Sequence, residues 1–329
     1  MRAGRLAVLS GSLFVFLASL AGCAQRAQDS SAQLVVEASH VAPTAQVEAP
    51  KVETVLVRGA ELAYMQAGQG DPVVFVHGSL SDLNTFRPQF DAFAEQYRVV
   101  SYSRRYHPPN QPPANDSVYS ATLHAQDLAA LIETLGLERP HIVASSYGAY
   151  TSLMLAIQRP TLVRSLVLGE PPAFPVIWKT AEGEPVFKAF EEGALQPARR
   201  AFERGDLEDG MRQFIEGVTG VKGLFDQIPA PGRAELMTYG RVMQREMLTD
   251  LAHYMPQVSC DDLKALKVPT LLVTGDQSAR FFHVITDEIA RCLPKRERIE
   301  IPNAGHSMHL DNTVTYNAEV LKFLGAHGS

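Results

Sequence analysis

The chain has 329 residues, of which 46% are hydrophobic and 20% are charged, and its formal net charge is −6. That length and composition suit one large or two modest globular domains with a substantial core. The acidic balance argues against nucleic acid as a partner, and 3 cysteines are too few for a disulfide scaffold.

Residues 1–22 are predicted to form a signal peptide rather than part of the fold. Arg2 and Arg5 form a positive n-region, and the following apolar run carries no charge and is short for a transmembrane helix. The segment closes with Leu-Ala-Gly-Cys at 20–23, which resembles the lipobox of bacterial lipoproteins. In those proteins the cysteine is acylated and becomes the mature N-terminus. An ordinary secretory signal with a chance cysteine is the alternative.

The lipobox resemblance implies a membrane anchor at Cys23 and a place in the bacterial cell envelope. Ala24 after the cysteine implies the outer membrane, facing the periplasm, if the organism is Gram-negative. A secreted or periplasmic soluble protein is the alternative. Residues 23–51 are rich in Ala, Gln, Ser, Val and Pro, show no periodicity and predict a flexible tether.

Residues 52–169 alternate short apolar runs with amphipathic stretches. The runs at 52–57 and 61–65 predict a hairpin, and the continuously apolar run at 73–76 predicts a strand buried on both faces. The elements expected next are helix 86–97, strand 97–102, helix 120–135, strand 142–144, helix 149–157 and strand 162–168. This alternation predicts an α/β fold with a mostly parallel, doubly wound sheet.

The pattern changes in residues 170–262, which hold several prolines and several helix-like stretches with aromatic and methionine side chains. We interpret this segment as an inserted helical cap, with an ordinary helical subdomain as the alternative. The α/β pattern returns in residues 263–329. There the expected elements are strand 268–274, helix 281–292, strand 298–301 and a closing helix at 317–324.

One predicted strand-to-helix junction carries a candidate nucleophile. The chain reads Ala-Ser-Ser-Tyr-Gly over 144–148, with small residues two before and two after Ser146. A nucleophile elbow needs such residues, because the chain turns sharply and holds the serine in a costly backbone conformation. Ala144 stands where the usual pattern has glycine. Taken alone, the motif also fits a turn with a serine N-cap.

Serine is a poor nucleophile at neutral pH, so it needs a histidine base and a carboxylate that orients the imidazole. These partners are expected at the carboxyl ends of later strands, in the order Ser, acid, His. Asp276 and His306 both meet that condition and complete a predicted triad with Ser146. Glu170 also follows a predicted strand and is the alternative acid, and His309 is the alternative base.

Two further pairs of residues are candidates for a function. Arg104 and Arg105 lie in the proline-rich loop 103–114, at a strand end where loops line the ligand crevice of α/β sheets. They could bind a substrate carboxylate or be structural. Cys260 and Cys292 could form a disulfide in an oxidising periplasm or remain free thiols.

Together these motifs resemble the α/β-hydrolase fold superfamily over residues 52–324. The resemblance rests on His77-Gly78-Ser79, the elbow at 144–148, Gly275-Asp276 and Ala304-Gly305-His306. It implies that Ser146 is the nucleophile, His306 the general base and acid, and Asp276 the orienting acid. It also implies an oxyanion hole formed by the backbone N–H groups of Ser79 and Tyr147. The cap would lie over the active site.

The resemblance implies a serine hydrolase that forms an acyl-enzyme with a small carboxylic ester, lactone or related substrate. One alternative keeps the triad for carbon–carbon bond hydrolysis or cofactor-free perhydrolysis. An alternative of another class is a non-catalytic lipoprotein that binds a ligand or partner. The sequence has no metal motif and no glycine-rich phosphate loop, so we expect no cofactor and no metal.

Overall fold

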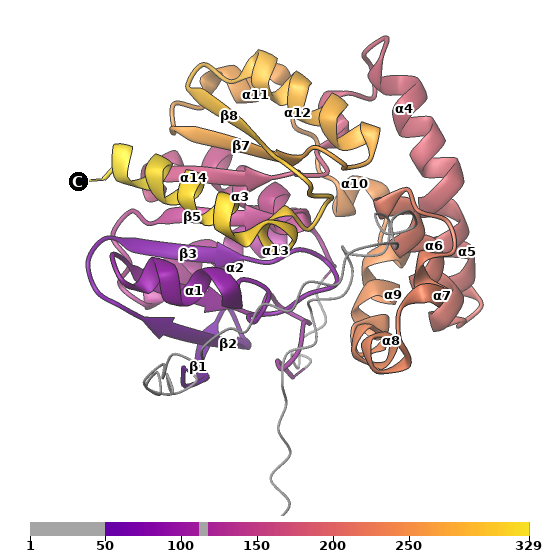
Figure 1. Cartoon of the computed structure of the whole chain (residues 1–329), viewed down its shortest axis with the longest axis horizontal. Coiled ribbons are helices and arrows are strands. Elements are labelled where there is room, and N and C mark those ends of the chain that lie inside the picture. Colours follow the sequence, from indigo (N-terminus) through magenta and orange to yellow (C-terminus); the bar gives the residue numbers. More distant parts are fainter. Residues whose placement is uncertain (1–49, 112–117, 329) are drawn as a thin grey trace, which may run out of the picture.

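The computed structural model describes residues 50–111 and 118–328 (Figure 1). The predicted signal peptide, Cys23 and nearly all of the predicted tether lie outside the described residues. Within the described part of the chain, no helix is both long and apolar enough to cross a membrane.

One 8-stranded sheet forms the centre of the fold, in the order β1-β2-β4-β3-β5-β6-β7-β8. β2 is antiparallel to both of its neighbours, and every other neighbouring pair is parallel. The strands are β1 Glu53–Val57, β2 Ala60–Ala67, β3 Pro72–Val76, β4 Arg98–Tyr102, β5 His141–Ser145, β6 Ser165–Gly169, β7 Thr270–Gly275 and β8 Arg296–Ile301. The predicted hairpin and the predicted mostly parallel sheet are therefore present.

Helices cover both faces of the sheet. The helices outside residues 170–262 are α1 Arg87–Ala94, α2 Ala121–Thr134, α3 Tyr147–Gln158, α12 Arg280–Cys292, α13 Met308–Asp311 and α14 Thr313–Ala326. Buried side chains of α1 and α14 pack in one apolar cluster, and those of α2, α3 and α12 pack in the other. Every residue of β3, β5, β6 and β7 is buried between these layers, which explains the apolar run at the centre of each of those strands.

Between β6 and β7 the chain forms a series of helices, most of which lie together on one side of the sheet (Figure 1). These helices are α4 Gly183–Phe190, α5 Gln196–Glu203, α6 Leu207–Thr219, α7 Leu224–Gln227, α8 Ala230–Met237, α9 Gly240–Leu248, α10 Leu251–Tyr254 and α11 Cys260–Ala265. We call residues 170–262 the helical insertion. Its bounds as a separate cap stay a prediction.

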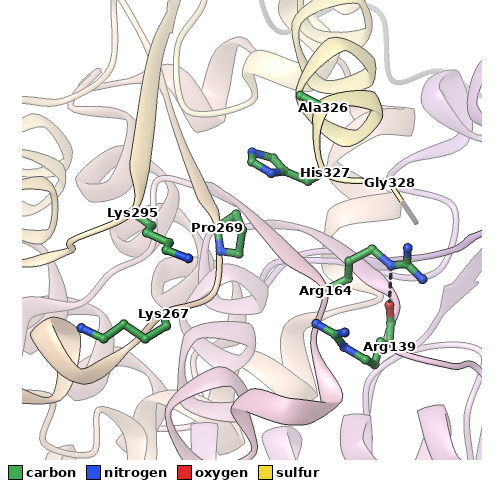
Figure 2. A pocket seen from close by; sticks show the side chains of 8 residues that line it. All are labelled: Arg139, Arg164, Lys267, Pro269, Lys295, Ala326, His327 and Gly328. Atoms are coloured by element: carbon green, nitrogen blue, oxygen red, sulfur yellow. Dashed lines mark hydrogen bonds between the residues drawn. The ribbon is translucent and has the colours of Figure 1, made fainter.

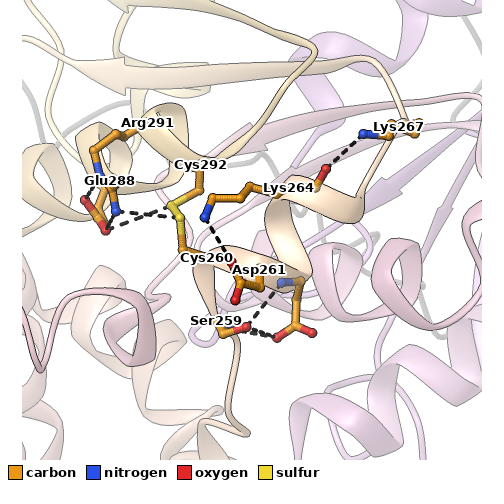
Figure 3. A network of polar contacts seen from close by, with 9 residues as sticks. Ser259, Cys260, Asp261, Lys264, Lys267, Glu288, Arg291 and Cys292 are labelled. Carbon is orange, nitrogen blue, oxygen red and sulfur yellow. Dashed lines mark hydrogen bonds and ion pairs between the residues drawn. A yellow bond between two sulfur atoms is a disulfide. The ribbon is translucent and has the colours of Figure 1, made fainter.

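A disulfide joins the end of the helical insertion to the sheet domain (Figure 3). Cys260 at the start of α11 is bonded to Cys292 at the end of α12, with Cα atoms 5.2 Å apart. Ser259 and Asp262 form a capping box at the start of α11. Of the two alternatives for these cysteines, the structure therefore contains the paired one.

Candidate active site

Ser146 lies between β5 and α3 in a strained backbone conformation, with φ 54° and ψ −128°. Such a conformation costs roughly 1–3 kcal/mol, so its surroundings must hold it. The N–H of Ser146 donates to the Gly169 carbonyl at 2.7 Å. Gly148 leaves no room for a side chain, because a Cβ there would lie 2.3 Å from the carbonyl oxygens of both Val76 and His77. This is the geometry predicted for a nucleophile elbow.

Ala144, which stands in place of the usual glycine, has no exposed methyl group. It is fully buried and pairs with Val76 of β3 and Leu168 of β6. The methyl group belongs to the apolar cluster that also contains α2 and α3. The departure from the usual elbow pattern is therefore absorbed by packing.

His306 contacts Glu170 in the structure. Its Nδ1 lies 2.6 Å from Oε2 of Glu170, and the carboxylate is fully buried. The other oxygen, Oε1, accepts the N–H of Gly275 at 2.9 Å. The His306 ring stacks on Phe282 with centroids 4.1 Å apart. The alternative acid is thus the one that holds the imidazole.

The prediction that Asp276 orients His306 is contradicted by this geometry. Asp276 is exposed, and its Oδ1 accepts the N–H of Ala304 at 3.0 Å. Backbone hydrogen bonds, first from Ala304 and then from Asn303, hold the pKa of Asp276 below its ordinary value. Asp276 therefore supports the loop that carries His306, while the carboxylate beside the ring comes from the end of β6.

His309, the alternative base, lies in the core against Phe86, with ring centroids 4.8 Å apart. Among the described residues, neither of its ring nitrogens has a hydrogen-bond partner. Burial, with a smaller effect from His306, lowers the pKa of His309 to about 3. His309 is therefore a neutral core residue at physiological pH.

The loop that carries Ser79 lies against the elbow. A Cβ added to Gly78 would lie 3.0 Å from the Cβ of Ser146 and 3.5 Å from its Oγ. Tyr147 is the first residue of α3. In the described part of the chain, no group accepts a hydrogen bond from the amide of Ser79 or that of Tyr147. Both amides are therefore available to an oxygen atom beside Ser146.

Arg104 is fully buried, and its guanidinium donates to the chain itself. Nε donates to the His77 carbonyl at 3.0 Å, Nη2 to the Gly78 carbonyl at 2.8 Å and Nη1 to the Tyr119 hydroxyl at 3.0 Å. Each of these donors is therefore engaged before any substrate arrives.

Arg105 is also removed from solvent. Its Nε and Nη2 donate to the two carboxylate oxygens of Asp127 at 2.6 and 2.7 Å. Of the two alternatives for Arg104 and Arg105, the structure supports the structural one over contact with a substrate carboxylate, since both guanidinium groups are buried and paired. Both arginines hold loops together instead.

Glu246, a fully buried carboxylate in α9 of the helical insertion, was not among the predicted site residues. Its Oε1 accepts the hydroxyls of Ser79 and Tyr254 at 2.5 and 2.8 Å, and its Oε2 accepts that of Tyr119 at 2.9 Å. Burial raises the pKa of Glu246, and Arg104 is the main opposing influence. A signal was present in the sequence: Glu246 stands on the same helical face as the buried Val242 and Met243.

Two other features lie apart from Ser146. A basic cavity of about 560 Å³ is lined by Arg139, Arg164, Lys267, Pro269, Lys295, Ala326, His327 and Gly328 (Figure 2). Its loop residues precede β5, β6, β7 and β8, so it lies at the amino edge of the sheet.

Among the described residues, the only group with metal-ligand spacing is Cys260, Glu288 and Cys292. Its two sulfur atoms are bonded to each other (Figure 3).

Comparison with known proteins identifies the family. The family model for the alpha/beta hydrolase fold matches residues 71–313. The sn-1-specific diacylglycerol lipase ABHD11 of Mus musculus is 28% identical over 261 residues, covering 77% of this chain and 80% of the lipase.

Solved structures share the fold at lower sequence identity. A thermophilic esterase from Thermogutta terrifontis has a TM-score of 0.65 at 22% identity, and the match covers 85% of this chain and 100% of the esterase. A meta-cleavage product hydrolase from Pseudomonas fluorescens has a TM-score of 0.65 at 17% identity, covering 83% and 97%. The family match and the similarity to the lipase support a hydrolytic function. The chain belongs to the α/β-hydrolase fold family.

Proposed function

We propose that the protein is a serine hydrolase that cleaves a carboxylic ester, a lactone or a related small substrate through an acyl-enzyme. One observation carries the proposal. The strained Ser146 and the His306–Glu170 pair all follow the carboxyl ends of strands, at the same edge of the sheet, and the amides of Ser79 and Tyr147 there have no hydrogen-bond acceptor among the described residues. The similarity to a diacylglycerol lipase favours an ester as the substrate.

In the proposed reaction, the Oγ of Ser146 attacks the substrate carbonyl while Nε2 of His306 takes the hydroxyl proton. Glu170 keeps the other proton on Nδ1 and stabilises the imidazolium. The amides of Ser79 and Tyr147 bind the oxyanion, and each such donor contributes on the order of 3 kcal/mol in the transition state. His306 then returns its proton to the leaving alcohol, and water hydrolyses the acyl-enzyme by the same steps.

Labelling with a fluorophosphonate probe tests the proposal. We expect one covalent adduct, located at Ser146 by peptide mass spectrometry, and no adduct in the Ser146→Ala variant. Folded wild-type protein that remains unlabelled would refute the mechanism. A panel of aryl esters of increasing acyl length, lactones and vinylogous diketones then separates ester cleavage from carbon–carbon bond hydrolysis.

We also propose that the protein is lipid-anchored through Cys23 in an oxidising compartment of the bacterial envelope. The lipobox-like ending at 20–23 supports the anchor. The Cys260–Cys292 disulfide supports the compartment, since such bonds persist where thiols are not kept reduced. Mass spectrometry of the mature protein should find a diacylglyceryl group on Cys23, and Cys23→Ser should move the protein to the soluble fraction. An unmodified Cys23 would contradict the anchor.

A further inference from the structure

We infer that Arg104 and Glu246 are positioning residues for the oxyanion hole. The hole is then formed only when α9 of the helical insertion is packed in place. This inference rests on the proposed function. It concerns how the Gly78–Ser79 peptide and Tyr147 are held, not the chemistry that they perform.

Hydrogen bonds to its carbonyl group fix the orientation of the Gly78–Ser79 peptide. A trans peptide is planar, so its C=O and N–H point in opposite directions. The Gly78 carbonyl accepts Nη2 of Arg104 at 2.8 Å and Nδ1 of His77 at 2.8 Å. Nε2 of His77 accepts the backbone N–H of Arg104 at 2.9 Å, which leaves the proton on Nδ1. Two donors therefore hold the carbonyl on one side, and the Ser79 N–H faces the other.

Arg104 carries a charge that is fully buried. A buried guanidinium is costly unless it is compensated, and removing its partner is strongly destabilising. Glu246 supplies the opposite charge through the Tyr119 hydroxyl, which accepts from Arg104 at 3.0 Å and donates to Glu246 at 2.9 Å. The carboxylate also accepts the Ser79 hydroxyl at 2.5 Å. The oxyanion-hole residue is thus held through its backbone by Arg104 and through its side chain by Glu246.

Tyr147, the other residue with an available amide, is also held by the helical insertion. Its ring stacks on Tyr254 of α10 with centroids 4.8 Å apart, and its hydroxyl donates to the Tyr254 carbonyl at 2.7 Å. The Arg104 guanidinium lies 5.2 Å from the centroid of the same ring. The Tyr254 hydroxyl in turn donates to Glu246 at 2.8 Å. The insertion therefore contacts both residues whose amides face the substrate.

The consequence is a coupling between the helical insertion and catalysis. If α9 moves away from the sheet domain, Arg104 loses its counter-charge and the Ser79 hydroxyl loses its hydrogen-bond acceptor. Ser146, His306 and Glu170 would keep their places, because within residues 50–111 and 118–328 none of their hydrogen bonds goes to α9. The enzyme would then be able to bind substrate but would stabilise the oxyanion poorly. Removal of Glu246 should accordingly lower kcat more than it raises KM.

The experiment measures three variants, Glu246→Gln, Ser79→Ala and the two changes combined. Glu235→Gln is measured beside them as the control. Glu235 is an exposed acid in α8 of the same insertion and is the matched control. Active sites are counted by fluorophosphonate labelling, and kcat and KM for one aryl ester are measured per labelled site. Ser79→Ala keeps the amide and removes only the hydroxyl, so it tests the anchor with little risk to folding.

We expect Glu246→Gln to lower kcat about 10- to 100-fold, since displacing an oxyanion donor costs less than the 10²- to 10³-fold of removing one. Ser79→Ala should lower kcat in the same direction. A glutamine at position 246 can still accept the Ser79 hydroxyl through its amide oxygen, so the double variant, which loses this contact as well, should be slower than Glu246→Gln alone. Glu235→Gln should match the wild type.

A purely structural Glu246 would lower the unfolding midpoint while kcat per labelled site stayed unchanged, and that result would overturn the inference. Should Glu246→Gln fail to fold, Ser79→Ala and Tyr254→Phe decide, because unchanged kcat in both would also overturn it. An unlabelled, inactive wild type would instead refute the proposed function, so the two failures are distinguishable.

Discussion

Replacing Glu170 by glutamine tests the triad most directly. The Oε1 of Glu170 accepts the Gly275 N–H at 2.9 Å, so the glutamine must keep its carbonyl oxygen there. Its NH₂ group then faces Nδ1 of His306, where Oε2 now lies at 2.6 Å. Nδ1 must accept that hydrogen bond, which moves the ring proton to Nε2. Nε2 can then no longer take the proton of Ser146, and the imidazolium also loses its counter-charge.

The magnitude follows from both losses. Forcing the wrong tautomer with an amide in a serine triad lowers kcat about 10⁴-fold, which corresponds to about 5.4 kcal/mol of transition-state stabilisation. Glu170 is fully buried, so water cannot replace the missing charge. We therefore expect the Glu170→Gln variant to have a kcat about 10⁴-fold below that of the wild type for an aryl ester at pH 8. The folded fraction is checked by circular dichroism.

Asp276→Asn is the matched control. Asp276 is exposed and accepts the Ala304 N–H, a bond that the asparagine oxygen preserves. Its kcat should stay within about threefold of the wild type, as expected for a surface change that keeps its hydrogen bond. If Asp276→Asn loses as much activity as Glu170→Gln, or if Glu170→Gln keeps a tenth of the wild-type kcat, the assignment of the acid is wrong.

Three further outcomes are expected. Gly148→Ala places a Cβ 2.3 Å from two carbonyl oxygens, so urea denaturation should show a loss of about 3 kcal/mol or more in the free energy of unfolding; a smaller loss would contradict the tight elbow. Cys260→Ser with Cys292→Ser opens a loop of sequence separation 32 and should cost about 3.5 kcal/mol by the same measurement, while kcat per labelled site is kept. For His309, burial lowers the pKa to about 3 in the folded protein, whereas the unfolded chain takes up a proton below about pH 6.5. Stability should therefore fall as the pH falls, and between pH 7 and pH 5 the wild type should lose about 2 kcal/mol more than His309→Phe; equal losses would rule this out.

The sheet and the elbow were predictable because their signals are local. Strands β3, β5, β6 and β7 are buried on both faces, so each contains a short run of consecutive apolar residues. Position 148 must be a glycine, because a Cβ there would lie 2.3 Å from the carbonyl oxygens of Val76 and His77. The groups that impose this requirement are distant in the sequence, but the residues on which it falls lie within a few positions of Ser146, and a sequence pattern records them.

The acid was not predictable from the pattern, because Glu170 and Asp276 each follow a strand end. The choice depends on the direction that the loop after β8 gives to His306, and that direction comes from tertiary contacts. Glu246 was missed for a similar reason. Its partners Ser79 and Tyr119 lie 167 and 127 positions away in the sequence. The burial of Arg104 follows from the same distant contacts.

The boundary of the helical insertion has a practical consequence for chimeric enzymes. Exchanging such insertions between homologues is an obvious route to altered substrate preference. A graft that begins at residue 170 would discard the carboxylate bonded to His306. A graft that replaces α9 without a carboxylate at position 246 would leave Arg104 without its counter-charge. Working chimeras of this scaffold should therefore keep residue 170 from the recipient and supply an acid at position 246.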